Sequence, residues 1–364
     1  MNSKKVQLFN FFARYLTSSL AIKVVFISFA AVLLTVVFPA RGTEVSSASA
    51  LHVEAIPLID AHSQVDCLVS KDLVMRQLER LRISRVLISV RGCRGWTTEQ
   101  LEGRTLDWSK EHPDRISALV STKVDGWSYA SLSSGEVEAL GPRAHRLGFV
   151  GMGEVLVQHA AHEHAQLSYP ELALRLDDVR IQKAIEVARD KKWPVILHIE
   201  LNDNEEAADQ TLADLGAMLT RNADVQFGLI HMAQASAREA RSLLEKYSNV
   251  FFLTTKADNS AAGATKKSLK KGVVAQTGWI NMFRGQCELQ DCPSEWKPEW
   301  KKLIVEYPNH FVLAFENVFP QHWEEPFAIK VGIWRRALAM LPAEVAHAVA
   351  HRNAERLWKL PAAK

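Results

Sequence analysis

The chain has 364 residues and nearly balanced charge, with 44 Lys and Arg residues against 41 Asp and Glu residues and a net charge of +3. A basic excess this small argues against a nucleic-acid-binding protein, which usually carries a larger and clustered surplus. The composition is 48% hydrophobic and 23% charged, which excludes disorder, collagen-like repeats and coiled coil over most of the chain.

Residues 1–42 have the composition of a targeting segment. They contain five basic residues and no acidic one, and the uncharged run VVFISFAAVLLTVVF lies just before Pro39. A basic leader followed by such a run is typical of a secretory signal peptide, with residues 43–55 as a linker to the mature domain. Residues 20–39 are nearly long enough to span a bilayer, so a retained membrane anchor is the alternative. We therefore expect a periplasmic or secreted protein, or one that this segment anchors to the membrane.

From residue 56 onward the chain alternates short apolar runs with amphipathic helical patterns. The runs are rich in Val, Ile, Leu and Phe and lack strict alternation, as buried parallel strands do. The eight predicted strands are residues 56–62, 85–92, 116–124, 148–157, 194–200, 225–232, 250–257 and 310–318. Helices are predicted at residues 74–81, 181–191, 235–247 and 300–306.

Eight strands with helices between them predict an α/β fold, a single (β/α)8 TIM barrel over residues 56–364. A doubly wound open sheet is the alternative. It is disfavoured because no Gly-rich dinucleotide-binding turn follows the first strand.

The four cysteines form an even set, which in an oxidising compartment favours disulfides. Cys67 and Cys93 each follow an apolar run, so they could meet across neighbouring strand ends. Cys287 and Cys292 could close a local loop. The sequence leaves the pairing open, and unpaired core cysteines are the alternative.

Residues 258–299 form a connection that is long for a compact domain, and such loops are usually functional or disordered. In a barrel this connection lies on the catalytic face, which makes Trp279 and Arg284 candidate substrate-binding residues. Arg91 and Lys256, each close to a predicted strand end, could hold a substrate carboxylate through charge-assisted hydrogen bonds. Their alternative is a solvent-exposed charge at the start of a loop.

Polar side chains recur at the carboxyl ends of five predicted strands. On the first strand, a two-residue period puts Asp60, His62 and Gln64 on one side. The other four strands contribute Glu154, His198, His231 and Glu316. Three histidines and two carboxylates are ligands that a divalent metal uses, and burying them without partners would be very costly. For any one of these histidines taken alone, a hydrogen-bonded core position is the alternative.

Several short motifs follow one another along residues 56–360. They are DAH, GMGE, PVILH, LIHM, a carboxylate on the last predicted strand, and RNAERLWKL. The order of these motifs resembles that of the amidohydrolase superfamily. More narrowly, it resembles the amidohydrolase-related (amidohydrolase 2) group of metal-dependent barrel hydrolases. The resemblance implies that His62, His198 and His231 are metal ligands and that Glu154 is a ligand or lines the site. It also implies that Glu316 is both a ligand and the catalytic base.

Two positions depart from the family pattern. Gln64 replaces the second histidine of H-x-H, and Glu316 replaces the aspartate of the eighth strand. Gln64 offers a neutral amide oxygen, and Asp66 could substitute as an oxygen ligand. The extra methylene of Glu316 can displace a base by about 1 Å. The sequence therefore leaves open one or two ions, weak metal binding, or lost catalysis.

The resulting hypothesis is an exported metal-dependent hydrolase of an amide, ester or lactone, with zinc as the expected metal. The divalent ion lowers the pKa of bound water, Glu316 takes the proton, and His231 polarises the scissile carbonyl. The alternatives are a non-oxidative decarboxylase of an aromatic or related carboxylic acid, a reaction the family also contains, and a catalytically impaired barrel that binds a ligand.

The expected partner is a small-molecule substrate, with no nucleic acid and with membrane contact only through an uncleaved N-terminal segment. A homo-oligomer is compatible with the sequence. His159, His162 and His164 follow the fourth strand as HAAHEH and are secondary metal candidates, interpreted first as a polar loop.

Overall fold

A computed structural model of the chain divides into two units, residues 1–44 and 45–364. The structure describes residues 56–93, 95–122, 134–159, 162–164, 167–169, 171–201, 205–258, 265–268, 274–277, 281–284 and 295–363. The predicted signal or anchor segment, the linker, Trp279, Cys287 and Cys292 lie outside these residues. Within the described ranges, no helix combines the length and the apolar character needed to cross a membrane.

The predicted strands are present and form two sheets. The first sheet is parallel, in the order β1-β2-β3-β4, and the second has the order β14-β11-β10-β9-β5-β8, parallel except for β8. The strands of the first sheet are β1 (Leu58–Val65), β2 (Ile83–Val90), β3 (Ile116–Val120) and β4 (Phe149–Met152). Those of the second are β5 (Glu154–His159), β8 (Leu172–Ala173), β9 (Val195–Ile199), β10 (Phe227–Leu229), β11 (Val250–Leu253) and β14 (Phe311–Val312).

The fourth predicted strand is divided at Gly153, so that β4 pairs with β3 and β5 pairs with β9. A Cβ at Gly153 would lie 2.9 Å from the Cβ of Ser89 on β2. A larger residue would clash with Ser89, so glycine fits the position where the chain passes from one sheet to the other.

Backbone hydrogen bonds join β1 to the segment that follows β14. The amide of Ala61 donates to the carbonyl of Leu313 over 3.0 Å, and that of Glu316 donates to His62 over 2.8 Å. These bonds bring the first and last parallel strands of the chain together.

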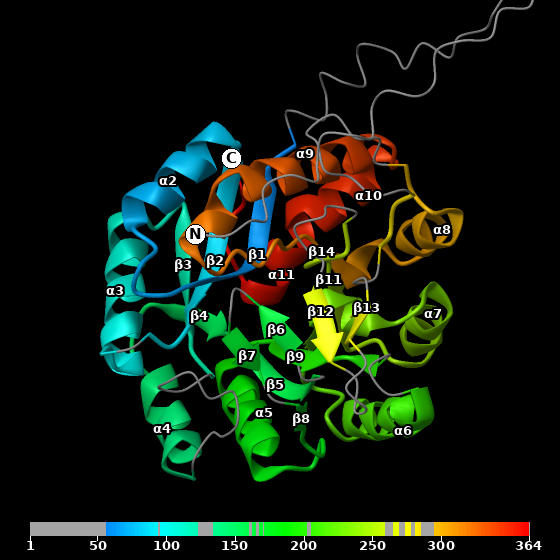
Figure 1. Ribbon diagram of the computed structural model, residues 1–364, viewed down its shortest axis with the longest axis horizontal. Helices are drawn as coiled ribbons and strands as arrows, with labels where there is room; N and C mark the ends of the chain where they lie inside the picture. The colour runs from blue at the N-terminus through cyan, green and yellow to red at the C-terminus, as the bar shows by residue number, and fades with distance from the viewer. Residues whose placement is uncertain are drawn as a thin grey trace, which may run out of the picture. The chain divides into compact units, whose positions relative to one another are not determined.

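Helices lie around the outside of the strands (Figure 1). They are α2 (Lys71–Arg80), α3 (Thr98–Glu111), α4 (Ser134–Ala144), α5 (Val179–Lys191), α6 (Glu205–Arg221), α7 (Ala237–Lys246), α8 (Pro298–Glu306) and α9 (Glu325–Ala339). The predicted helices at residues 74–81, 181–191, 235–247 and 300–306 correspond to α2, α5, α7 and α8. Capping boxes begin α3 at Thr97 and α7 at Ser236, as helices with orphan N-terminal amides require.

An apolar cluster fills the space between the strands. It combines buried side chains of several strands, such as Ile59, Leu87 and Phe251, with Trp358 of α11 (Asn353–Trp358). A helix α10 (Ala343–His347) and a π-helical turn (Ala348–Arg352) precede α11. The C-terminal helix therefore packs against the strands. The polar residues described below lie within β1 and β9, at the start of β5, and after β10, β11 and β14.

Two connections contribute a separate antiparallel sheet of order β13-β12-β6-β7. Its strands are β6 (His162–His164), β7 (Leu167–Tyr169), β12 (Thr265–Ser268) and β13 (Val274–Thr277). The interpretation of His162 and His164 as part of a polar loop is wrong, because both lie on β6. The long connection after β11 likewise contains two strands that its sequence did not reveal.

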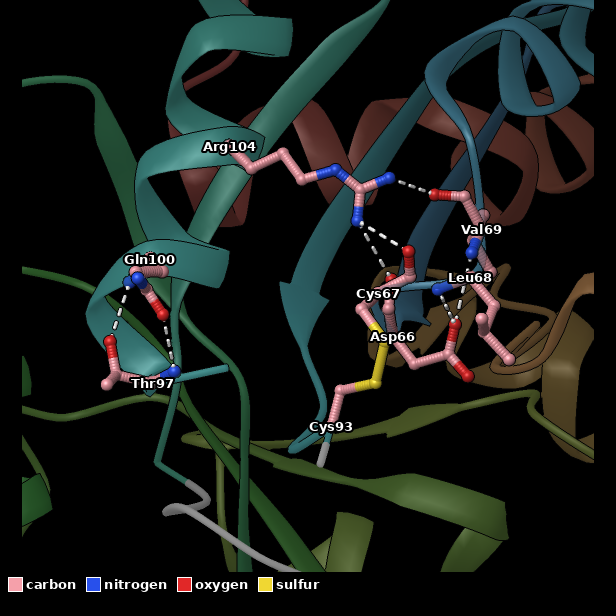
Figure 2. Close-up of a disulfide and its surroundings, with 8 residues drawn as sticks. All are labelled: Asp66, Cys67, Leu68, Val69, Cys93, Thr97, Gln100 and Arg104. Atoms are coloured by element: carbon pink, nitrogen blue, oxygen red, sulfur yellow. Dashed lines mark hydrogen bonds between the residues drawn. A yellow bond between two sulfur atoms is a disulfide. The ribbon is translucent and has the colours of Figure 1, made fainter. Parts of the chain in front are cut away.

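Cys67 and Cys93 form a disulfide, as their position after neighbouring predicted strands allowed. Figure 2 shows the bridge between the segments that follow β1 and β2. In the same view the guanidinium of Arg104, on α3, donates hydrogen bonds to three backbone carbonyls of the loop after β1. The bridge and the guanidinium fix this loop at the carboxyl end of β1.

Candidate metal centre

The five predicted histidine and carboxylate ligands come together in the structure. They form two overlapping groups, Glu154 with His198 and His231, and Glu154 with His62 and Glu316. Within each group one ligand atom of each residue lies within 4.8 Å of the others, and all five residues are buried. The convergence expected at the carboxyl ends of parallel strands is therefore present.

The distances in this cluster fit a metal ion. Oε2 of Glu154 lies 3.3 Å from Nδ1 of His198 and 3.8 Å from Nε2 of His62. Nε2 of His231 lies 3.5 Å from Oε2 of Glu316. A tetrahedral ion with bonds of about 2.1 Å holds its ligand atoms about 3.4 Å apart. The residues present thus fit a divalent metal in both chemistry and spacing.

Glu200 orients His198. Its Oε1 lies 3.2 Å from Nε2 of His198, on the opposite side of the ring from Glu154. A carboxylate that accepts the proton of one imidazole nitrogen leaves the lone pair of the other nitrogen for a metal. The sequence analysis missed Glu200, although it stands two residues after His198 in PVILHIE, the same spacing that grouped Asp60 with His62.

Thr255 orients His231 in the same way that Glu200 orients His198. Its Oγ1 lies 2.9 Å from Nδ1 of His231 and accepts the backbone amide of that residue over 2.8 Å. Burial holds the pKa of His231 well below its ordinary value, so the ring is neutral. Neutral imidazole with Nδ1 hydrogen-bonded presents Nε2 to a metal. Nothing in the sequence around Thr255 indicated this partner.

Three of the site residues adopt a left-handed backbone. The φ angles are 54° for His231, 52° for Lys256 and 55° for Glu316. The sequence analysis placed all three within strands, which is wrong, because β10, β11 and β14 end before them. The left-handed conformation costs an L-residue roughly 1–2 kcal/mol and redirects the side chain away from the strand's alternation.

Glu316 is ionised and lies between two partners. Its Oε2 is 3.5 Å from Nε2 of His231 and 3.3 Å from Nζ of Lys256. Burial opposes ionisation, yet the positive charge of Lys256 helps to hold the pKa of Glu316 well below its ordinary value. Lys256, predicted to bind substrate, thus contacts one of the predicted metal ligands directly.

The predicted oxygen ligands of the first strand have other contacts. Gln64 turns its amide nitrogen to Glu154, donating to Oε1 over 3.2 Å, so it holds the carboxylate whose Oε2 faces the histidines. Asp66, considered as a substitute ligand, accepts the backbone amides of Leu68 and Val69 with Oδ1. It belongs to neither of the two groups found among the described residues.

Asp60 connects the first and last strands beneath the cluster. Its carboxyl accepts the amide of Phe315 over 3.0 Å, the amide of His62 over 3.2 Å, and the hydroxyl of Ser63 over 2.6 Å. Burial raises the pKa of Asp60 to about 7, although these hydrogen bonds oppose the rise. Asp60 therefore positions two ligand-bearing segments relative to each other.

The remaining candidates have contacts of their own. His159 is buried, and its ring centroid is 5.8 Å from that of His198. Arg91 is half-buried, with its guanidinium 5.3 Å from the centre of the Phe319 ring. Arg284 is exposed and pairs with Glu295 over 3.7 Å.

The parallel α/β fold gathers buried histidines and carboxylates in one cluster, an arrangement that metal-dependent barrel enzymes use. The chain belongs to the amidohydrolase family, which it matches over residues 97–360. It is an enzyme of the amidohydrolase superfamily. No curated protein matches the chain.

Solved structures share the fold at low sequence identity. The 4-oxalomesaconate hydratase LigJ of Rhodopseudomonas palustris is 13% identical, with a TM-score of 0.50 over 83% of this chain and 95% of that one. An uncharacterised TIM-barrel protein of Bordetella bronchiseptica is 12% identical, with a TM-score of 0.49 over 80% and 83%. The 5-carboxyvanillate decarboxylase LigW of Sphingomonas paucimobilis is 13% identical, with a TM-score of 0.46 over 84% and 100%.

Proposed function

We propose that this protein is an exported, metal-dependent hydrolase that cleaves an amide, ester or lactone with activated water. The observation that carries the proposal is the buried cluster of His62, Glu154, His198, His231 and Glu316. Such a set of imidazole and carboxylate donors suits zinc. We also propose that the eight parallel strands close into a single (β/α)8 barrel, a proposal that the hydrogen bonds between β1 and residues 313–317 support.

The chain's own residues supply the proton transfers. A bound divalent ion would supply the positive charge that lets water lose a proton near neutral pH. Glu316 is ionised, so its Oε2 can accept that proton and return it to the leaving group. The neutral ring of His231 is held by Thr255 and lies 3.5 Å from this oxygen, where it can polarise the scissile carbonyl.

The proposal also names residues that determine specificity. We assign the binding of substrate to Arg91, Lys256, Trp279 and Arg284, of which Lys256 contacts the ligand Glu316. The composition of residues 1–42 supports export to the periplasm or beyond, with anchoring through residues 20–39 as the alternative.

The test combines metal analysis with an activity panel. The full chain, stripped with a chelator and reloaded with Zn2+, is expected to bind zinc and to hydrolyse at least one amide, ester or lactone. H198A should lose both properties, whereas H145A, which changes an exposed histidine, should keep them. Absence of bound zinc after supplementation, together with unchanged behaviour of H198A, would refute the proposal. Carbon dioxide release from an aromatic acid would identify a decarboxylase instead, and bound zinc without either reaction would indicate a binding protein.

A further inference from the structure

Lys330 is a buried lysine that the proposed reaction does not use. It lies on α9 and is 5% exposed, and its Nζ donates to the backbone carbonyl of Phe315 over 3.3 Å. Phe315 directly precedes Glu316, the residue that we assign as the base. A side chain from a helix thus reaches the backbone beside the base.

The burial of this amine is costly. Burial lowers the pKa of Lys330, and the carboxylate of Asp258 gives the largest opposing effect. An apolar side chain of similar length would avoid the cost of desolvation. What the amine provides, and an apolar side chain lacks, is the hydrogen bond to Phe315, which an amine can donate in either protonation state.

The peptide group that joins Phe315 to Glu316 is held on both sides. Its carbonyl oxygen accepts the hydrogen bond of Lys330, and its N–H donates to the carbonyl of His62 over 2.8 Å. The next peptide group is also held, because its N–H donates to Oγ of Ser63 over 3.0 Å. These two peptide groups flank the Cα atom of Glu316, so their orientations determine its φ and ψ angles.

Glu316 needs such restraint because its φ is 55°. The left-handed region is unfavourable for an L-residue, and such a conformation persists when the surrounding contacts over-determine it. Of the three hydrogen bonds described above, two come from β1 and the third from Lys330. Loss of the amine removes the bond on the carbonyl side and gives the first peptide group freedom to rotate.

We propose that Lys330 is a positioning residue that holds Glu316 in its left-handed conformation and so keeps its carboxylate beside His231. Rotation of the peptide group would change φ and move Oε2 of Glu316 away from Nε2 of His231, which now lies at 3.5 Å. This proposal rests on the proposed function, since only there is Glu316 a metal ligand and the base.

The first measurement is the backbone of Glu316 in crystals of the metal-free full chain. K330M removes the donor, and K330Q keeps a donor on a side chain of similar length. Residue 316 is expected to leave the left-handed region in K330M and to remain there in K330Q and in the unaltered chain. A φ that stays near 55° in K330M overturns the proposal.

The second measurement is the affinity for Zn2+ by calorimetry. K330M should bind zinc about 10- to 100-fold more weakly, as loss of a group that orients a ligand does, and K330Q should recover most of this loss. V331A, which truncates the neighbouring buried side chain on α9, is the matched control. It should lower the urea midpoint and leave the zinc affinity unchanged.

The outcomes separate this proposal from the one on which it rests. Equal zinc affinities of K330M and the unaltered chain, or equal losses in K330M and K330Q, overturn the role of the hydrogen bond from Lys330. If the unaltered chain binds no zinc, the proposed function is refuted, and the φ of residue 316 in K330M still decides whether Lys330 holds this backbone. Circular dichroism checks the fold, and K330L, which also lacks a donor, replaces K330M if that variant does not fold.

Discussion

Replacement of Asp60 by asparagine isolates the contribution of a buried carboxyl to stability. In D60N the amide oxygen can still accept the backbone amides of His62 and Phe315, and the new amide nitrogen can donate to the hydroxyl of Ser63, 2.6 Å from the present carboxyl oxygen. The three contacts can thus be kept, with the one to Ser63 reversed in direction, and the ability to ionise is removed.

The sign and size of the effect follow from the pKa of Asp60. Burial raises this pKa from 3.8 to about 7, so the folded state binds the proton more tightly than the unfolded state does. The corresponding stability is complete below pH 3.8 and is lost as the pH rises through about 7. The whole difference is worth about 4 kcal/mol, of which about 2–3 kcal/mol falls between pH 5 and pH 8.

Urea unfolding of the metal-free protein at pH 5 and pH 8 measures this effect. Relative to the unaltered chain, D60N should gain about 2–3 kcal/mol in unfolding free energy between the two pH values. S63A should do the opposite, since loss of a hydrogen bond that lowers the pKa of Asp60 makes the unaltered carboxyl harder to ionise. A difference between D60N and the unaltered chain that is the same at both pH values would refute this reasoning.

Three further changes test the packing and the orientation of the ligands. Removal of the disulfide in C67A/C93A, whose cysteines are 26 residues apart, should lower the unfolding free energy by about 3 kcal/mol; urea midpoints that match those of the oxidised chain would contradict this. G228A places a Cβ 2.6 Å from Cζ of Phe251 and should cost about 1–3 kcal/mol, measured by urea unfolding; an unchanged stability would show that the interior relaxes. E200Q should weaken zinc binding about 10- to 100-fold in calorimetry, and an unaltered affinity would exclude its role in orienting the histidine.

The strands could be predicted because buried strands consist mainly of apolar residues. A parallel strand covered on both faces reads as a continuous apolar run, and each such run contains an observed strand. The break at Gly153 could not be predicted, because it depends on contact with Ser89 of another strand. The strands β12 and β13 were missed for a related reason: β12 pairs with β6, which is contributed by a distant connection.

The convergence of the candidate ligands could be predicted for a geometric reason. Residues at the carboxyl ends of parallel strands converge in a barrel, so His62, His198 and Glu316 could be grouped from chain position alone. The residues that orient them could not, because a glutamate or threonine acquires that role only from the ring it contacts. Thr255 illustrates this, since its hydroxyl meets His231 across 24 positions of sequence.

The left-handed backbone of three site residues helps to direct their side chains toward one another. His231, Lys256 and Glu316 follow three short strands, and their side chains contact one another through Oε2 of Glu316. A regular strand would send alternate side chains to opposite faces, whereas one left-handed residue at the strand's end redirects its side chain. Each such residue costs roughly 1–2 kcal/mol, and that cost is sustained at a functional site when surrounding contacts determine the conformation. Because these three residues meet at one carboxylate, part of the chain's backbone strain lies at the group that we assign as the base.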